Sequence, residues 1–312
     1  MRNFLIGAVV ALACAASLPM LVQAEYYYVL GFTVLQLIIM ATAWNILGGF
    51  AGYVNFGSGA FFAVGAYTAV SLFKAFALPL GLQILAGAAM AGLLGLGVGL
   101  LTLRLRGIFF SIATIAITII LETVVLNWTY VGGAKGLPIL RPTEIPLFGN
   151  YTQWLFFVMV VIAVVAIAVA RYIQMSWIGR GLRAIRDSEE AAECSGVPTL
   201  RLKIFSTMVS CALMGMAGTT FPYYLSYIEP SSAFSLSYAI NSIAMPLIGG
   251  MMSWIGPLIG AVLLGTVQQV VQVTVSSAWN LLIVGVLLVL FVTLAPNGIM
   301  GWVDAWRRRK GR

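Results

Sequence analysis

The sequence predicts an all-α, polytopic integral membrane protein with about ten transmembrane helices and a short helix outside the membrane between the sixth and the seventh. Two observations carry this prediction. Hydrophobic residues make up 61% of the 312 residues and charged residues only 8%, whereas a soluble domain carries about 25% charge. Apolar runs long enough to cross a hydrocarbon core of about 30 Å recur along nearly the whole chain. Residues 1–312 are therefore expected to form a single transmembrane domain in a lipid bilayer.

Gly, Pro and charged residues set the ends of the apolar runs. Pro79 separates the third run from the fourth, and the longest polar stretch, residues 174–203, separates the sixth from the seventh. The boundaries after residue 226 are the least defined, because the eighth run is short and a Gly-rich turn follows it. The expected helices lie near residues 4–24, 28–47, 56–78, 80–103, 108–127, 151–172, 204–226, 238–252, 256–275 and 280–295.

The first run also has features of a signal peptide. Met1 and Arg2 precede it, and it ends in Val22-Gln23-Ala24, which resembles a small-residue cleavage site. Because the run from Phe4 to Ala24 is already long enough to span a membrane, we expect an uncleaved first helix. Cleavage is the alternative that the sequence leaves open.

The basic residues predict which side each loop faces, because Lys and Arg are retained in short cytoplasmic loops. With the N-terminus in the cytoplasm, every Lys and Arg falls on that side except Lys74, Lys135 and Arg141. An even number of helices then puts both termini and segment 174–203 in the cytoplasm. This topology explains the net charge of +8 better than nucleic-acid binding does, since the basic residues are not grouped with aromatic ones.

The residue types needed for catalysis and metal binding are scarce. The sequence has no histidine, which removes the commonest general base and metal ligand. Cys14, Cys194 and Cys211 have no paired spacing, so neither a disulfide framework nor a metal site is expected. We predict no catalytic residue, no metal and no cofactor.

Segment 174–203 is the one large polar segment expected in the cytoplasm. Its middle has a helix-forming composition that ends at Gly196 and Pro198, which predicts a short helix bracketed by transmembrane helices. Arg183 and Asp187 lie one turn apart, as do Arg186 and Glu190, and such pairs stabilise a helix by a few tenths of a kcal/mol. A solvated linker is the simplest interpretation of a charge run, and a docking site for another protein is the alternative.

Within this segment, Glu190-Ala191-Ala192 followed by Gly196 is similar to the coupling-helix signature of importer permeases, and RAIRD precedes it. With four further blocks, this segment resembles the permeases of the branched-chain amino acid type of bacterial ABC importer. The blocks keep their order over most of the chain, so together they are specific. The other similar blocks are Trp44–Ala69, Leu103–Thr114, Asn127–Leu137 and Gly249–Ala261.

This resemblance implies a heteromeric importer in the bacterial inner membrane. The expected partners are a second homologous permease subunit, two cytoplasmic ATP-binding subunits and an extracytoplasmic solute-binding protein. The chain has no GxxxxGK[ST] loop that would cradle phosphates, so ATP hydrolysis is expected from the partners. The resemblance also implies that the coupling residues are Arg183, Arg186, Glu190, Ala191, Ala192 and Gly196.

The chain departs from the family at the start of its third helix. Many members have a glutamine and a histidine where this chain has Tyr53 and Ser58. Branched-chain amino acids are the first expectation for the solute, and the resemblance leaves urea, amides and aromatic acids as alternatives.

Polar residues within apolar runs are the candidates for a solute path, because polar groups in hydrocarbon are costly and tend to face protein or water. For each of them, a hydrogen bond between helices, worth about 0.6 kcal/mol on average, is the alternative. Gly57 and Gly59 permit a broken helix, which is a recurring way to line a substrate site. The candidates are Asn45, Asn55, Ser58, Gly59, Thr118, Asn241 and Gln268.

Glu122 is the only carboxylate clearly inside a predicted span. It lies about five residues from the outer end, so it either reaches the interface or acts with a partner, for which Lys74 is the nearest candidate. A stand-alone secondary transporter or channel is a second functional hypothesis, although the chain lacks paired intramembrane charges. An intramembrane enzyme is a third functional hypothesis, but the sequence shows no nucleophile paired with a base.

Overall fold

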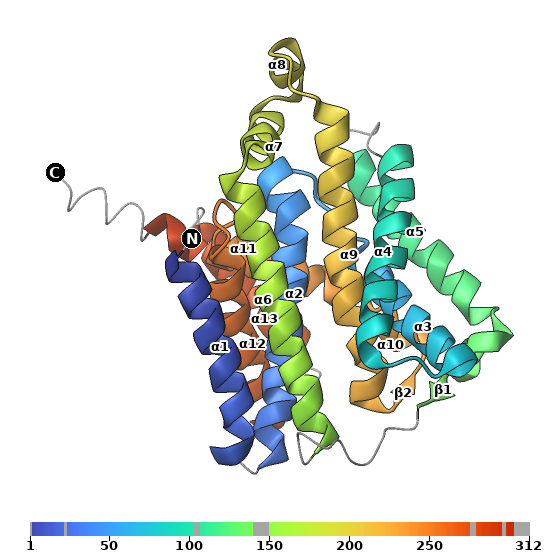
Figure 1. Cartoon of the computed structure of the whole chain (residues 1–312). Helices are drawn as coiled ribbons and strands as arrows, with labels where there is room; N and C mark the ends of the chain where they lie inside the picture. The colour runs from blue at the N-terminus through green and yellow to red at the C-terminus, as the bar shows by residue number, and fades with distance from the viewer. Residues whose placement is uncertain are drawn as a thin grey trace.

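The chain is described from a computed structural model, which covers residues 2–21, 24–102, 107–139, 150–274, 279–294 and 298–302. These residues form a helical bundle with one short pair of strands (Figure 1). In chain order the elements are α1 (Arg2–Leu21), α2 (Glu25–Ala51), α3 (Ser58–Phe76), α4 (Leu80–Thr102), α5 (Ile108–Leu126), η1 (Thr129–Val131), η2 (Gly133–Lys135), β1 (Leu137–Pro138), α6 (Tyr151–Met175), α7 (Trp177–Asp187), α8 (Glu189–Cys194), α9 (Thr199–Leu225), β2 (Tyr227–Ile228), α10 (Pro230–Ala233), α11 (Leu236–Gly249), α12 (Gly256–Thr274) and α13 (Trp279–Leu294).

Each of the ten predicted apolar segments coincides with a helix. Six of these helices, α2 to α6 and α9, are long and apolar enough to cross a membrane. The other four are α1, α11, α12 and α13. Helix α11 has 14 residues and α13 has 16, which is shorter than the roughly 20 residues of a typical crossing. An all-α membrane protein is therefore confirmed, and the number of ten crossings stays a prediction.

Helices α2 and α5 occupy opposite positions in the bundle. In the most apolar 18-residue stretch of α2, 72% of the residues are buried within the chain, compared with only 17% in that of α5. Figure 1 shows α2 inside the bundle between α6 and α9, with α5 at one edge. Helix α5 therefore presents most of its surface to whatever surrounds the chain.

Helices α3, α4 and α9 pack with their backbones almost in contact. A Cβ atom on Gly65 of α3 would collide with the carbonyl of Gly215 in α9, and one on Gly218 would collide with the carbonyl of Phe62. A Cβ on Gly215 would lie 2.7 Å from the carbonyl oxygen of Gly87 in α4. Small residues let membrane helices approach this closely, so the three helices form a tight unit beside α2.

A two-stranded pair lies toward the end of the bundle away from α8 (Figure 1). Strand β1 pairs antiparallel with β2, with Leu137 opposite Ile228 and Pro138 opposite Tyr227. The pair joins the segment that follows α5 to the segment that follows α9. Of the predicted external loop 128–150, residues 140–149 lie outside the described part of the chain.

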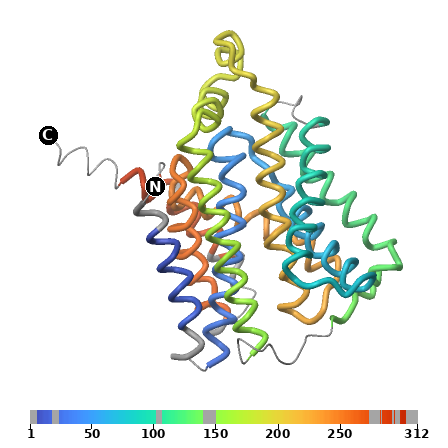
Figure 2. The backbone as a smooth tube through the Cα atoms, viewed as in Figure 1, coloured from blue at the N-terminus to red at the C-terminus, as the bar shows by residue number. Residues whose placement is uncertain are grey.

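The polar segment 174–203 differs from the single short helix that the sequence predicts. It forms two helices, α7 and α8, which follow α6 beyond one end of the bundle (Figure 2). They are separated at Ser188, which has an extended backbone and accepts a hydrogen bond from the amide of Ala191. A serine at this position caps a new helix, and the break removes the helical spacing assumed for Arg186 and Glu190.

Candidate functional site

The polypeptide is unwound between α2 and α3, over residues 52–57, where Tyr53, Asn55 and Gly57 are buried while Gly52 and Val54 are exposed. Buried backbone outside a helix needs hydrogen-bond partners, and two such bonds are made at Asn55. Its carbonyl accepts a hydrogen bond from Trp44 Nε1 at 2.8 Å, and its Oδ1 accepts one from the Gly57 amide at 2.7 Å. Asn55 is only 1% exposed, so its side chain holds the break in shape.

Helix α5 carries a row of polar side chains that runs along this unwound stretch. Ser111, Thr114, Thr118 and Glu122 follow one another at intervals of three or four residues, which places them on one helix face. Ser111 Oγ donates to the carbonyl of Val54 at 2.9 Å, and Thr114 Oγ1 accepts from the Phe56 amide at 3.1 Å. The first half of the row is thus bonded to stretch 52–57.

The second half of the row, Thr118 and Glu122, faces a cavity of about 410 Å³, which we call the hollow. Its volume is in the range of small-molecule sites, about 300 to 1,000 Å³. The start of α3, one face of α5 and the segment 231–236 enclose it. The described residues that line it are Phe56, Gly59, Ile115, Thr118, Ile119, Glu122, Ser231, Phe234, Ser235 and Leu236.

Among the predicted path residues, Gly59 and Thr118 line the hollow. Asn55 and Ser58 are next in sequence to the lining residues Phe56 and Gly59 but do not line the hollow themselves. A Cβ on Gly59 would lie 2.9 Å from the carbonyl oxygen of Ser235, so glycine keeps α3 close to the 231–236 segment. Ser58 is fully buried, and its hydroxyl accepts a hydrogen bond from Ser242 Oγ at 3.0 Å. Ser58 therefore joins α3 to α11 and does not line the hollow.

The remaining predicted path residues make contacts elsewhere. Gln268 Nε2 donates to Asn241 Oδ1 at 2.9 Å, which joins α12 to α11. Asn45 Nδ2 lies 3.5 Å from the carbonyl oxygen of Ser253, and its buried Oδ1 has no hydrogen-bond partner among the described residues. None of the three lines the hollow.

Lys74 does not accompany Glu122. Its Nζ donates to the carbonyl of Tyr130 at 2.8 Å and lies 4.5 Å from the centroid of the Tyr130 ring. Within the described part of the chain, no hydrogen bond or ion pair involves the Glu122 carboxylate. The described residues also contain no cluster of His, Cys, Asp or Glu that would hold a metal ion.

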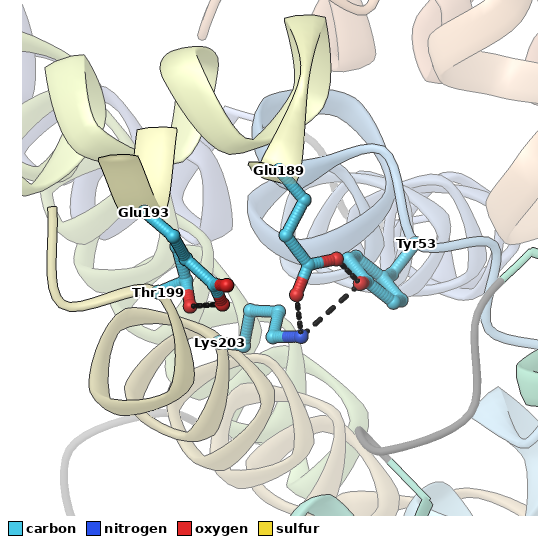
Figure 3. Close-up of polar contacts among 5 residues, drawn as sticks. All are labelled: Tyr53, Glu189, Glu193, Thr199 and Lys203. Carbon is cyan, nitrogen blue, oxygen red and sulfur yellow. Dashed lines mark hydrogen bonds and ion pairs between the residues drawn. The ribbon is translucent and has the colours of Figure 1, made fainter. Parts of the chain in front are cut away.

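Three polar side chains from distant segments converge between stretch 52–57 and α8, and we call them the latch cluster: Tyr53, Glu189 and Lys203 (Figure 3). Lys203 Nζ donates to Glu189 Oε1 at 2.6 Å and to Tyr53 OH at 3.2 Å. Tyr53 OH donates to Glu189 Oε2 at 2.5 Å. Lys203 is only 3% exposed, and a buried cation of this kind needs its anion close by.

The latch cluster connects the start of α8 to the unwound stretch. A second contact holds α8 against α9, because Thr199 Oγ1 donates to Glu193 Oε1 at 2.7 Å (Figure 3). Sequence reasoning noted Tyr53 as a departure from the family but missed Glu189 and Lys203. In the sequence, Lys203 is the last residue of the polar segment 174–203. Its place directly before an apolar run is the signal that could have marked it as a buried cation.

The predicted coupling residues divide into an inward and an outward group. Arg186 Nη1 donates to the carbonyl of Gly49 at 2.6 Å, and Ala192 is buried, so both face the bundle. Gly196, at which the helix-forming composition was expected to end, has a positive φ of 79°. The outward group consists of Arg183, Glu190, Ala191 and Gly196, which are exposed.

Comparisons with known proteins identify the family. The family described as the branched-chain amino acid transport system permease component matches residues 27–292. The chain belongs to this permease family. It is similar to the high-affinity branched-chain amino acid transport system permease protein LivM of Escherichia coli, with 27% identity over 84% of this chain and 67% of that protein.

Two further relatives are also permeases. A probable branched-chain amino acid transport permease protein LivH of Methanocaldococcus jannaschii is 26% identical over 82% of this chain and 85% of its own length. The ribose import permease protein RbsC of Haemophilus influenzae is 30% identical over 43% of each chain. No solved structure matches the permease. Together with its apolar helices, these findings make the chain a multi-pass membrane permease subunit of the inner membrane rather than an enzyme.

Proposed function

We propose that this permease is one of two membrane subunits of an ATP-driven importer for an amino acid-like solute, with branched-chain amino acids as the first expectation. Its partners are a second homologous permease, two cytoplasmic ATP-binding subunits and an extracytoplasmic solute-binding protein. The observation that carries the proposal is the family match over residues 27–292. The projecting pair α7 and α8 supports it, because a permease driven by soluble ATPases needs a docking element outside the membrane.

The membrane topology has ten crossings, with both termini and helices α7 and α8 on the cytoplasmic side. The excess of Lys and Arg on that side supports this orientation. It is also consistent with the course of the chain, since α6 leads into α7 and α9 returns from α8 across the bundle (Figure 1).

The solute path follows the polar row of α5 and is completed by the second permease. Helix α5 is the least covered of the six long apolar helices, and a polar row with a carboxylate is costly against lipid. The hollow then forms the outward part of the path. The hydrogen bonds of Ser111 and Thr114 to stretch 52–57 close the inward part.

Coupling runs from α8 through the latch cluster to stretch 52–57. When an ATPase subunit moves α8, Glu189 moves with it, and the hydrogen bond from Tyr53 transmits the displacement to the closed part of the path. Hydrogen bonds to charged groups are stronger than neutral ones, so the contacts of Glu189 should persist when α8 moves.

Replacement of Ala191 by Trp tests the docking of α8. Ala191 is exposed, so the larger side chain should leave the stability of the isolated permease within about 0.5 kcal/mol. It should nevertheless prevent a helix from seating in a groove on the ATPase. We expect loss of ATPase co-purification and of ATP-driven leucine uptake in proteoliposomes that contain the whole complex.

Arg183→Ala is the matched control. Arg183 is exposed and its Nε donates to the carbonyl of Gly179 within α7 at 3.2 Å, so uptake should fall by less than about twofold. Full coupling in the Ala191→Trp complex would remove α8 from the mechanism. Uptake by the wild-type permease without ATPase subunits would favour a stand-alone transporter.

A further inference from the structure

The lining of the hollow has a simple set of polar groups. Among the described residues that line it, Glu122 is the only ionisable one, and the hydroxyl groups of Thr118, Ser231 and Ser235 are the other polar side-chain groups. No Lys or Arg contributes to the lining, and Lys74 is held at Tyr130. The hollow thus offers a single negative charge to a bound molecule.

A carboxylate within an apolar span is costly, and such residues face a water-filled cavity or a partner charge. Glu122 is half-buried and lies one helical turn beyond Thr118, about 6 Å along the axis of α5. It lines the hollow together with Gly59 at the start of α3 and the apolar residues Ile115 and Ile119 of its own helix. This arrangement suits a small molecule with a cationic group at one end.

We propose that the hollow is a solute subsite in which Glu122 binds the ammonium group of an amino acid. This inference rests on the proposed function, because it assumes that the hollow belongs to the solute path. A charge-assisted hydrogen bond from ammonium to carboxylate is about twice as strong as a neutral one. An organic acid without an ammonium group brings only a negative charge and is repelled by Glu122. Urea and simple amides gain nothing from its charge.

The subsite thus selects amino acids among the solutes that the family resemblance leaves open. It acts after the solute-binding protein has released its ligand, and it discriminates by charge rather than by the shape of the apolar side chain. Ile115, Ile119 and Phe234 supply apolar surface for that side chain.

A labelling experiment on the whole complex in proteoliposomes tests the subsite. The exposed Cys14 and Cys194 are replaced by serine, and Ser231, an exposed residue of the lining, is replaced by cysteine. The rate of its reaction with N-ethylmaleimide is measured with added leucine or with 4-methylpentanoate, which has the same carbon skeleton and carboxylate but no ammonium group. We expect leucine to slow the reaction and 4-methylpentanoate to leave it unchanged.

Variants at position 122 sharpen the result. Glu122→Gln should raise the leucine concentration for half-maximal protection by about tenfold, and Glu122→Asp should restore most of the protection. Glu25→Gln is the matched control, because Glu25 accepts a hydrogen bond from Asn150 and does not line the hollow. Should Glu122→Gln fail to assemble, the comparison of the two solutes in the unaltered site still decides.

The outcomes separate the two proposals. Equal protection by leucine and 4-methylpentanoate, or undiminished protection in Glu122→Gln, overturns the ammonium subsite while ATP-driven uptake by the wild-type complex upholds the proposed function. Absence of ATP-driven uptake in the wild-type complex overturns the proposed function itself.

Discussion

Two glutamates of this permease illustrate how the surroundings of a carboxylate decide its role. Glu189 lies 2.6 Å from Lys203 Nζ and accepts a further hydrogen bond from Tyr53. Glu122 faces the hollow and has no cation among the described lining residues. Glu189 is paired with a cation 14 positions away in the chain and accepts a hydrogen bond from a hydroxyl 136 positions away. A paired carboxylate connects parts of the protein, whereas an unpaired one is open to a ligand.

Removal of the cation should have the largest effect on this comparison. Lys203→Met removes the cation that lies 2.6 Å from the Glu189 carboxylate. Loss of one member of a fully buried pair costs about 3 to 5 kcal/mol. The Glu189 side chain keeps 17% of its exposure, so we expect the free energy of unfolding to fall by about 2 kcal/mol. Thermal unfolding of the purified permease in detergent measures this loss.

The double variant Glu189→Gln with Lys203→Met is the control. It removes both charges, so it should recover most of the lost stability while ATP-driven uptake stays impaired. If Lys203→Met is as stable as the wild type, the ion pair of Glu189 does not stabilise the permease, and the contrast with Glu122 is wrong.

Neutralising the other glutamate should act in the opposite direction. Glu122→Gln removes an intramembrane charge that has no described partner in the chain, so we expect the permease to become more stable by about 1 kcal/mol. The same unfolding assay, run beside Glu189→Gln, measures the sign. A clear loss of stability in Glu122→Gln would mean that this carboxylate also has a structural partner.

Loss of the Tyr53 hydroxyl should cost less stability than loss of the Lys203 cation. Tyr53→Phe removes the hydrogen bonds to Glu189 and from Lys203 but keeps the ring, against which Lys203 Nζ lies 5.0 Å from the centroid. The ion pair remains, so stability should fall by about 1 kcal/mol. The ratio of solute imported to ATP hydrolysed should also fall, because stretch 52–57 is no longer tied to α8. An unchanged ratio would assign the hydroxyl to packing alone.

Length and apolarity predicted all ten helical segments within a few residues at most ends, because helices in lipid must be apolar and must satisfy their own backbone. The break at Ser188 was missed for a local reason. The residues on both sides of Ser188 favour a helix, so the sequence predicts one continuous helix there. The hydrogen bond from the Ala191 amide to Ser188 Oγ, which starts a second helix, is visible only in the structure.

The candidate site was predicted less completely, because its contacts cross the bundle. Gly59 and Thr118 were found from polarity and glycine content alone. Asn241 and Gln268 looked alike in sequence but are joined to each other, and nothing in the chain order reveals that pairing. The latch cluster needs residues 53, 189 and 203 to be brought together in space. The row from Ser111 to Glu122, in contrast, has a helical spacing that sequence reasoning could have used.

The backbone contacts among α3, α4 and α9 have a consequence for engineering the specificity of this permease. Gly65, Gly215 and Gly218 have no space for any side chain, so a mutagenesis library that varies them would mostly contain clones that do not fold. Around the hollow, Ile115, Ile119 and Ser231 are exposed and can take other side chains. On the proposed function, selection for new solutes should therefore vary these three positions, which line the proposed path, and leave the glycine-packed helices unchanged, because those helices hold the fold together.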